Sequence, residues 1–172
     1  WWNEVDNART PPTDRYAFAR ALPVLSSPGR LFQYSGVHAA ALGGFLGSQA
    51  IDPRRLLTDR ILRPLRITPR KWSVDGVGQP ILSHGMSLSA EQWGRIGMLM
   101  RDDGRYLGKQ VVASGKLAAC LVGSPAMPAY GFGWWLNAPL APAIFAQIPL
   151  LIREHLNNAE TGDARVRPFA PG

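Results

Sequence analysis

Apolar residues recur at helical spacing between residues 53 and 72, interleaved with seven basic residues. The apolar positions are Leu56, Leu57, Ile61, Leu62 and Leu65. This pattern predicts an amphipathic helix with a basic, solvated face. We expect it to begin at Asp52-Pro53, because aspartate caps helices and proline is favoured in a first turn. Pro64 and Pro69 then confine it.

A second helical pattern follows Ser89, which has the spacing of a capping box with Gln92. The sequence predicts a helix from this box to Asp102-Asp103-Gly104. Its apolar face is expected at the i, i+3, i+4 and i+7 positions, which are Trp93, Ile96, Gly97 and Met100.

Shorter patterns predict the other elements. Small residues predict a helix suited to close contact with another backbone. Further along the chain, a high content of aromatic residues favours a strand. Glycines at alternating positions in that strand indicate that something packs closely on one of its faces. The predicted elements are helices over 15–25 (capped near Thr13 or Asp14), 37–47 and 114–122, an ordered loop over 72–80, a strand or turn over 107–112, and a strand over 130–137.

The stretch around Tyr34 lies at a junction between predicted elements. Pro28-Gly29 breaks the preceding helix, Leu31 to Tyr34 is short and β-prone, and Ser35 can cap the next helix. These residues alone favour an aromatic anchor packed beneath a turn, with its hydroxyl on a backbone carbonyl. A chemical role for Tyr34 is the alternative.

Charge and composition exclude some functions. The chain has 172 residues, a net charge of +7 and 46% hydrophobic residues, with no apolar run long enough to span a bilayer. No zinc-ligand spacing, RNA-recognition aromatics or helix-turn-helix signature accompanies the charge, so we expect a solvated face rather than a nucleic-acid or anionic-membrane surface. Cys120, the only cysteine, lies in an apolar run and is expected to be a buried, inert thiol.

The order of several short motifs carries a family resemblance over residues 14–136. These motifs are Pro28-Gly-x-x-Phe32-x-Tyr34-Ser, Arg60-Ile-Leu-x-Pro64-Leu, Trp72-x-x-Asp75-x-x-Gly78, His84-Gly-Met-Ser-Leu-Ser89, Asp103-Gly and Tyr130-Gly-Phe-Gly-Trp-Trp. Their succession resembles the β-lactamase-related serine hydrolases, which include class C β-lactamases, D-alanyl-D-alanine carboxypeptidases, family VIII esterases and amide-bond hydrolases. The resemblance rests on order and spacing, because each motif alone is a weak signal.

This resemblance implies an α+β fold of the β-lactamase/transpeptidase type and acyl transfer on an ester, amide or peptide. In that family a serine of an S-x-x-K motif attacks a carbonyl, while the lysine and a tyrosine of a Y-x-N motif move protons. Tyr34 matches the tyrosine, and a lysine ammonium and the positive end of the following helix would favour its phenolate. Gly36 stands where asparagine is common, which favours an esterase or amidase over a β-lactamase.

The remaining predicted site residues are substrate-binding: Ser35, His84 and Gly85. His84 could line the pocket or could equally be hydrogen-bonded within its loop. His38 and His155 are expected to be structural or exposed. Of Trp134 and Trp135, which would alternate across a strand, one is expected in the core and the other at a pocket wall or interface. No metal or cofactor is expected.

The nucleophile motif is not found in the sequence. No serine is followed three residues later by lysine, and the nearest case, Thr68-Pro-Arg-Lys71, lies in a basic loop. No K-T-G or H-x-G follows Trp135. We therefore expect residues 1–172 to be a partial domain of a longer polypeptide, helical to about residue 125, with 138–172 as a long insertion or loop. The resemblance makes an extracytoplasmic location plausible, and a non-catalytic binding module or pseudoenzyme of the same fold is the alternative function.

Overall fold

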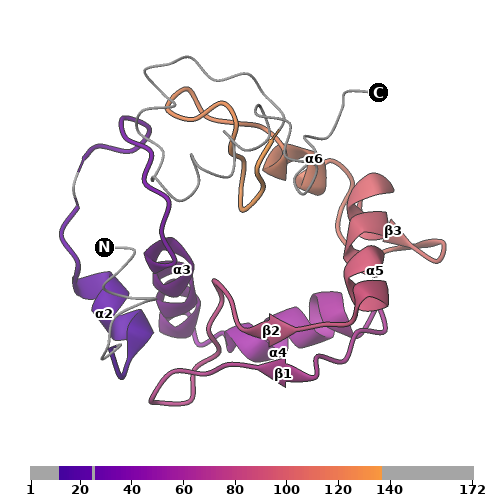
Figure 1. The fold of residues 1–172 in the computed structure, drawn as a ribbon, viewed down its shortest axis with the longest axis horizontal. Helices are drawn as coiled ribbons and strands as arrows, with labels where there is room; N and C mark the ends of the chain where they lie inside the picture. Colours follow the sequence, from indigo (N-terminus) through magenta and orange to yellow (C-terminus); the bar gives the residue numbers. More distant parts are fainter. Residues whose placement is uncertain (1–11, 25, 137–172) are drawn as a thin grey trace, which may run out of the picture. The chain divides into compact units, whose positions relative to one another are not determined.

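The structure, a computed structural model, describes residues 12–24 and 26–136 (Figure 1). These residues divide between two compact units. Of these residues, unit 1 holds 12–24 and 35–118, and unit 2 holds 26–34 and 119–136. The described residues form five α-helices, one π-helical turn and two small two-stranded antiparallel sheets. The fold is therefore mixed α+β, as the sequence predicts. None of these helices is long and apolar enough to cross a membrane.

Unit 1 begins with helix α2 (Arg15–Ala21). The Asp14 side chain caps it by accepting from the Ala17 N–H at 2.8 Å, as predicted. The predicted end at Leu25 is wrong, because the helix stops at Ala21. Pro23 explains the difference: the residue before a proline is driven to extended backbone, and Leu22 has φ −70° and ψ 141°.

Helix α3 (Val37–Ser48) packs against α2 through its glycines. A Cβ atom at Gly43 would lie 2.3 Å from the Tyr16 ring, and one at Gly44 would lie 3.1 Å from the Arg20 side chain. The predicted close contact of this small-residue helix is confirmed. Figure 1 shows the two helices side by side. Their shared core is formed by Tyr16, Ala19 and Ala40.

The loop over residues 74–80 is ordered by one carboxylate and one phenol. Asp75 accepts backbone hydrogen bonds from Arg15 at 3.1 Å and from Gln79 at 2.9 Å. The buried Tyr16 hydroxyl donates to the Pro80 carbonyl at 2.6 Å. Burial, together with the negative charges of Asp75 and Asp52, raises the pKa of Tyr16 to about 12. The predicted ordered loop is therefore confirmed, and it is tied to α2.

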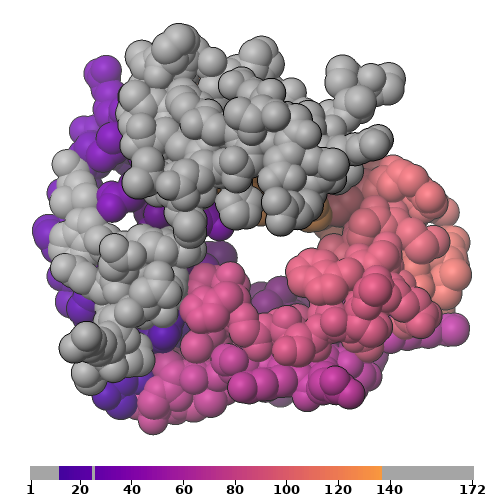
Figure 2. All heavy atoms as spheres, in the orientation of Figure 1, coloured from indigo at the N-terminus to yellow at the C-terminus, as the bar shows by residue number. Residues whose placement is uncertain are grey.

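The basic segment starts as predicted, with Asp52 capping α4 (Pro53–Leu57) at 2.8 Å from the Arg54 N–H. The helix then widens into a π-helical turn, η1 (Thr58–Leu62), and ends before Pro64. Its apolar residues form a second core in unit 1 with α5, made of Leu62, Leu65, Ile67 and Leu99. The magenta and pink atoms of this segment and the elements after it pack continuously in the space-filling view (Figure 2).

Helix α5 (Ala90–Arg101) has the predicted capping box, with reciprocal bonds between Ser89 and Gln92 at 3.1 and 3.2 Å. The predicted apolar face is only partly right. Trp93 is 56% exposed, whereas Leu99 is buried. Ile96, Leu99 and Met100 are also spaced i, i+3, i+4, so the sequence is equally compatible with an apolar face rotated around the helix. Of these residues, Leu99 is buried in the core and Ile96 packs against it.

The sheets are very short. β1 (Lys71–Trp72) pairs with β2 (Met86–Ser87), and β3 (Arg105–Tyr106) pairs with β4 (Lys109–Gln110) in a hairpin where a strand or turn was predicted. Helix α6 (Lys116–Cys120) lies within the predicted 114–122 range. Cys120 is half-buried, so the expectation of a buried thiol is wrong. The predicted insertion or loop over residues 138–172 and the expectation for His155 lie outside the described residues, as does the Asn137 end of the predicted strand.

The Tyr16 hydrogen bond generates a first prediction. Tyr16→Phe should lower the free energy of unfolding by about 1–2 kcal/mol, because it leaves the buried Pro80 carbonyl without its donor. Urea denaturation measures this, with Tyr106→Phe on the β3 hairpin as the matched control. The native pKa of Tyr16 lies above the ordinary value of 10.0, so its contribution is complete below pH 10 and is lost toward pH 12. The free energy of unfolding of Tyr16→Phe should therefore fall less steeply with pH across that window than that of the wild type. Equal slopes for the two proteins would contradict the raised pKa of Tyr16.

The turn after η1 generates a second prediction. Arg66 has φ 54°, a left-handed conformation that favours glycine. Arg66→Gly should therefore leave the free energy of unfolding unchanged or raise it by up to about 1 kcal/mol. The neighbouring Arg70→Gly, at a residue without positive φ, should lower it by roughly 0.5–1 kcal/mol. Chemical denaturation of both variants checks the contrast, and a destabilised Arg66→Gly would show that the arginine side chain holds the turn.

Candidate functional site around Tyr34

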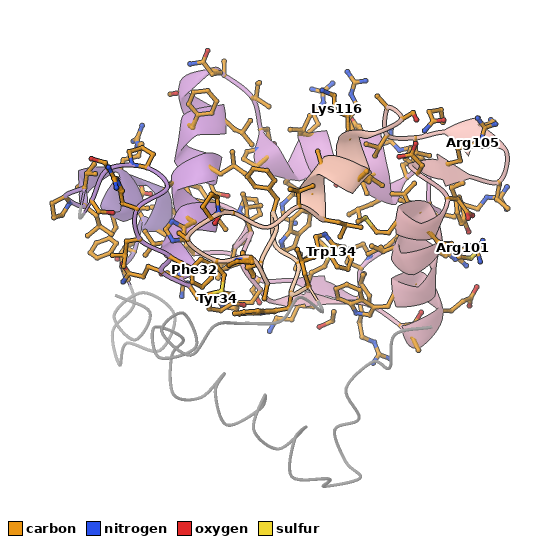
Figure 3. The ribbon with its side chains drawn as sticks, turned by 90° about the horizontal axis from the view of Figure 1, so that it is seen from above. Phe32, Tyr34, Arg101, Arg105, Lys116 and Trp134 are labelled. Carbon is orange, nitrogen blue, oxygen red and sulfur yellow. The ribbon has the colours of Figure 1, made fainter. Side chains whose placement is uncertain are left out.

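Tyr34 belongs to unit 2 and lies in a group of four rings, which we call the aromatic cluster: Phe32, Tyr34, Tyr130 and Trp135. Its ring centroid is 5.7 Å from that of Tyr130, edge-on at 90°, and 5.6 Å from that of Trp135. Tyr130 and Trp135 are themselves 4.9 Å apart. Phe32 and Tyr34 lie next to one another in Figure 3. These distances are typical of favourable aromatic pairs, so the rings of Tyr130 and Trp135 hold the Tyr34 ring in place.

The approach to Tyr34 is extended coil rather than the predicted short strand. Residues 31–35 form no strand, and the turn before them is closed by a hydrogen bond from the Arg30 N–H to the Ser27 carbonyl at 3.2 Å. Gly29, at φ 77°, supplies the left-handed conformation of this turn. The predicted break at Pro28-Gly29 is therefore confirmed.

Tyr130 and Trp135, the other half of the cluster, belong to a tight loop. The strand predicted over 130–137 is therefore wrong for the described residues. Tyr130 and Trp135 form only an isolated bridge, and the Gly131 N–H donates to the Trp134 carbonyl at 2.9 Å. Gly133 has φ 79°, which reverses the chain. A Cβ at Gly131 would lie 2.0 Å from the Cys120 carbonyl oxygen, so the predicted close packing on a glycine is confirmed there. The glycines serve a turn and a close approach rather than a strand face.

The two tryptophans of this loop do not divide as predicted. Trp134 and Trp135 are each 38% exposed, so neither is a core residue. Only Trp135 contributes to the aromatic cluster. The expected alternation required a strand, and the loop removes it. A sequence signal for Tyr130 and Trp135 was present in the density of aromatic residues over 130–135, but nothing in it indicated Tyr34 as their neighbour.

The two phenols of the cluster, Tyr34 and Tyr130, are both partly buried. Burial, with a smaller contribution from the neighbouring Tyr34, raises the pKa of Tyr130. Tyr130 therefore remains a neutral phenol at physiological pH. Tyr34 is half-buried, so its ring is held while part of the residue remains accessible. A phenol in such a setting can hold or pass a proton at its hydroxyl oxygen.

Ser35 belongs to unit 1 and has a structural task. Its hydroxyl accepts a hydrogen bond from the Val37 N–H at 3.1 Å, two residues on, as predicted for a residue that caps the following helix. The N-cap position of α3 is occupied by Gly36, which has no side chain to do this. Ser35 therefore satisfies one of the first N–H groups of α3.

His84 and Gly85 also belong to unit 1, in the loop before β2. His84 is exposed, and its Nδ1 atom lies 2.9 Å from the Ser83 hydroxyl, which agrees with a histidine hydrogen-bonded in its loop. Gly85 has φ 82°, and a Cβ there would lie 2.6 Å from the Ser73 hydroxyl oxygen. Gly85 is thus explained by backbone geometry beside the β1–β2 pair. The four predicted site residues are divided between the units, with Tyr34 alone in unit 2.

Within the described residues no three histidine, cysteine, aspartate or glutamate side chains gather as they would to hold a metal ion. The chain matches no protein-family model, and no curated protein matches it. The resemblance to serine hydrolases therefore stays a prediction from the order of motifs in the sequence.

Proposed function

We propose that this chain is part of a β-lactamase-related serine hydrolase that transfers an acyl group from a small ester, amide or peptide. The observation that carries the proposal is the ordered succession of motifs around Tyr34. In the sequence Tyr34 directly precedes Ser35, which caps the twelve-residue helix α3. That is the local arrangement expected of the tyrosine motif.

The geometry of the aromatic cluster supports a role for the Tyr34 hydroxyl. Catalytic groups act best when their orientation is fixed by packing before the substrate binds. The rings of Tyr130 and Trp135 brace Tyr34, and the residue is only half-buried.

In the proposed reaction a serine Oγ attacks the carbonyl carbon, and its proton passes to the lysine–Tyr34 pair. Collapse of the tetrahedral intermediate breaks the bond to the leaving group, which receives that proton through the Tyr34 hydroxyl. Water then hydrolyses the acyl-enzyme. The serine and lysine would come from residues outside this sequence, because no Ser-x-x-Lys occurs within it. Gly36 in the place of asparagine favours an ester or amide over a β-lactam.

The second candidate function is a non-catalytic binding module of the same fold. The observation that favours it is the aromatic cluster itself, because the neighbouring rings of Tyr130 and Trp135 are a sufficient structural reason for an aromatic residue at Tyr34. In that case the hydroxyl is dispensable for any chemistry.

A third prediction concerns the 172-residue chain alone. It should not hydrolyse chromogenic esters or cephalosporins, because it lacks the nucleophile–lysine motif. Spectrophotometric assays before and after repurification test this, and a fluorophosphonate probe reports any activated serine. Turnover that survives repurification, with a labelled serine in this chain, would contradict the motif assignment.

A fourth prediction separates the two candidate functions in a polypeptide that joins this chain to a Ser-x-x-Lys segment. Tyr34→Phe retains the ring packing and should lower the acylation rate by roughly 10²- to 10⁴-fold with little change in melting temperature. Tyr130→Phe removes a hydroxyl from the same cluster and should leave the acylation rate near wild type. Rates and melting curves come from one preparation of each variant. A Tyr34→Phe protein that is fully active would contradict the role of the Tyr34 hydroxyl, whereas a folded wild-type protein without turnover would support the binding module.

A further inference from the structure

Unit 1 contains a pocket of about 520 Å³ whose lining is strongly basic. We call it the basic pocket. Five of its lining residues are cationic, and none is acidic: Arg54, Arg63, Arg66, Arg70 and Lys71. The hydroxyl-bearing Thr58 and Thr68 also line it. Guanidinium, ammonium and hydroxyl groups are all hydrogen-bond donors, so the lining presents donors to whatever enters.

Little of this positive charge is neutralised within the described residues. Asp59 forms an ion pair with Arg63 at 2.9 Å and a longer one with Arg55 at 3.6 Å. The Arg54 guanidinium lies over the Trp72 ring, 5.1 Å from its centroid, and the ion pairs of the described residues do not include it. No ion pair among the described residues involves Arg66, Arg70 or Lys71. Concentrating like charges around a concavity raises the local potential, and a bound anion would relieve it.

The walls of the pocket are held by the second core of unit 1. Leu65 and Ile67 are buried on either side of Arg66 in the chain, so the backbone that carries Arg66 is fixed. The Arg95 guanidinium donates to the Arg66 carbonyl at 2.6 Å and fixes it further. Arg66 occupies a left-handed conformation at φ 54°, where glycine would be the unstrained residue. An arginine is therefore present there in spite of a local backbone cost, and its side chain lines the pocket.

We propose that the basic pocket binds a small, multiply charged anion of the phosphate or diphosphate class. Arginine forks match phosphate oxygens in pairs, and the volume is in the range of small-molecule sites. A nucleic acid is the less favoured ligand, because the described residues that line the pocket offer no open ring on which a base could stack. The one aromatic ring of the lining, Trp72, already carries Arg54 on its face and donates its indole N–H to the Ile81 carbonyl at 3.0 Å.

The test is calorimetric titration of the full 172-residue chain with inorganic pyrophosphate at low salt. Wild-type protein should bind with a dissociation constant of roughly 0.01–1 mM. Arg66→Gly and Arg70→Gln should each weaken binding by about fivefold or more. Arg66→Gly relieves backbone strain, so its melting temperature should not fall, and a binding loss cannot be attributed to unfolding. Arg105→Gln, on the β3 hairpin outside the lining, removes the same charge and should weaken binding less than about twofold.

Three results would overturn the proposal. The first is the absence of binding heat up to about 10 mM pyrophosphate. The second is an equal loss of affinity in Arg105→Gln and in the two pocket variants, which would show that the anion responds only to net charge. The third is a single-stranded oligonucleotide that binds tightly, is not displaced by pyrophosphate and is unaffected by Arg66→Gly, which would indicate an extended nucleic-acid surface.

Discussion

The contact between Tyr16 and the glycines of α3 is the constraint on which much of unit 1 depends. The Tyr16 ring occupies the space where a side chain at Gly43 would project, so α2 and α3 approach each other closely. The same residue reaches the Pro80 carbonyl with its hydroxyl, 64 positions away in the chain. One side chain thus joins two helices to a distant loop, and Asp75 strengthens the connection through the first N–H of α2. Local capping and long-range packing support each other at this point.

Features with a local physical cause could be read from the sequence, and features that depend on distant partners could not. Asp14, Asp52 and Ser89 cap helices as predicted, because a cap needs only its own next few residues. The early end of α2 also has a local cause, Pro23, which was overlooked. By contrast, the apolar residues of α5 are compatible with two different buried faces of the helix. Contact with Leu65 and Ile67, which come from another segment, decides which face is buried.

The candidate site also combines features that follow from nearby residues with features that depend on distant ones. The turn at Gly29 and the helix after Ser35 follow from residue types within a short window. The association of Tyr34 with Tyr130 and Trp135 brings together residues about a hundred positions apart, and no period or spacing encodes it. The strand predicted over 130–137 failed because glycines that permit close packing in a strand equally permit a reversal, and only the φ of Gly133 distinguishes the two.

The π-helical turn η1 contains one residue more than an α-helical path between the same ends requires. Its defining bond runs from the Arg63 N–H to the Thr58 carbonyl at 2.8 Å, a spacing of five residues. Each residue of an α-helix turns the chain by about 100°, so the extra residue offsets the side chains after Leu62 by roughly that angle relative to those before Thr58. At the end of the turn Leu62 is buried in the second core, while Arg60 and Arg63 beside it are exposed. Deletion of a single residue here would rotate the side chains on one side of η1 by about 100° relative to those on the other, so this segment is sensitive to chain length as well as to residue type.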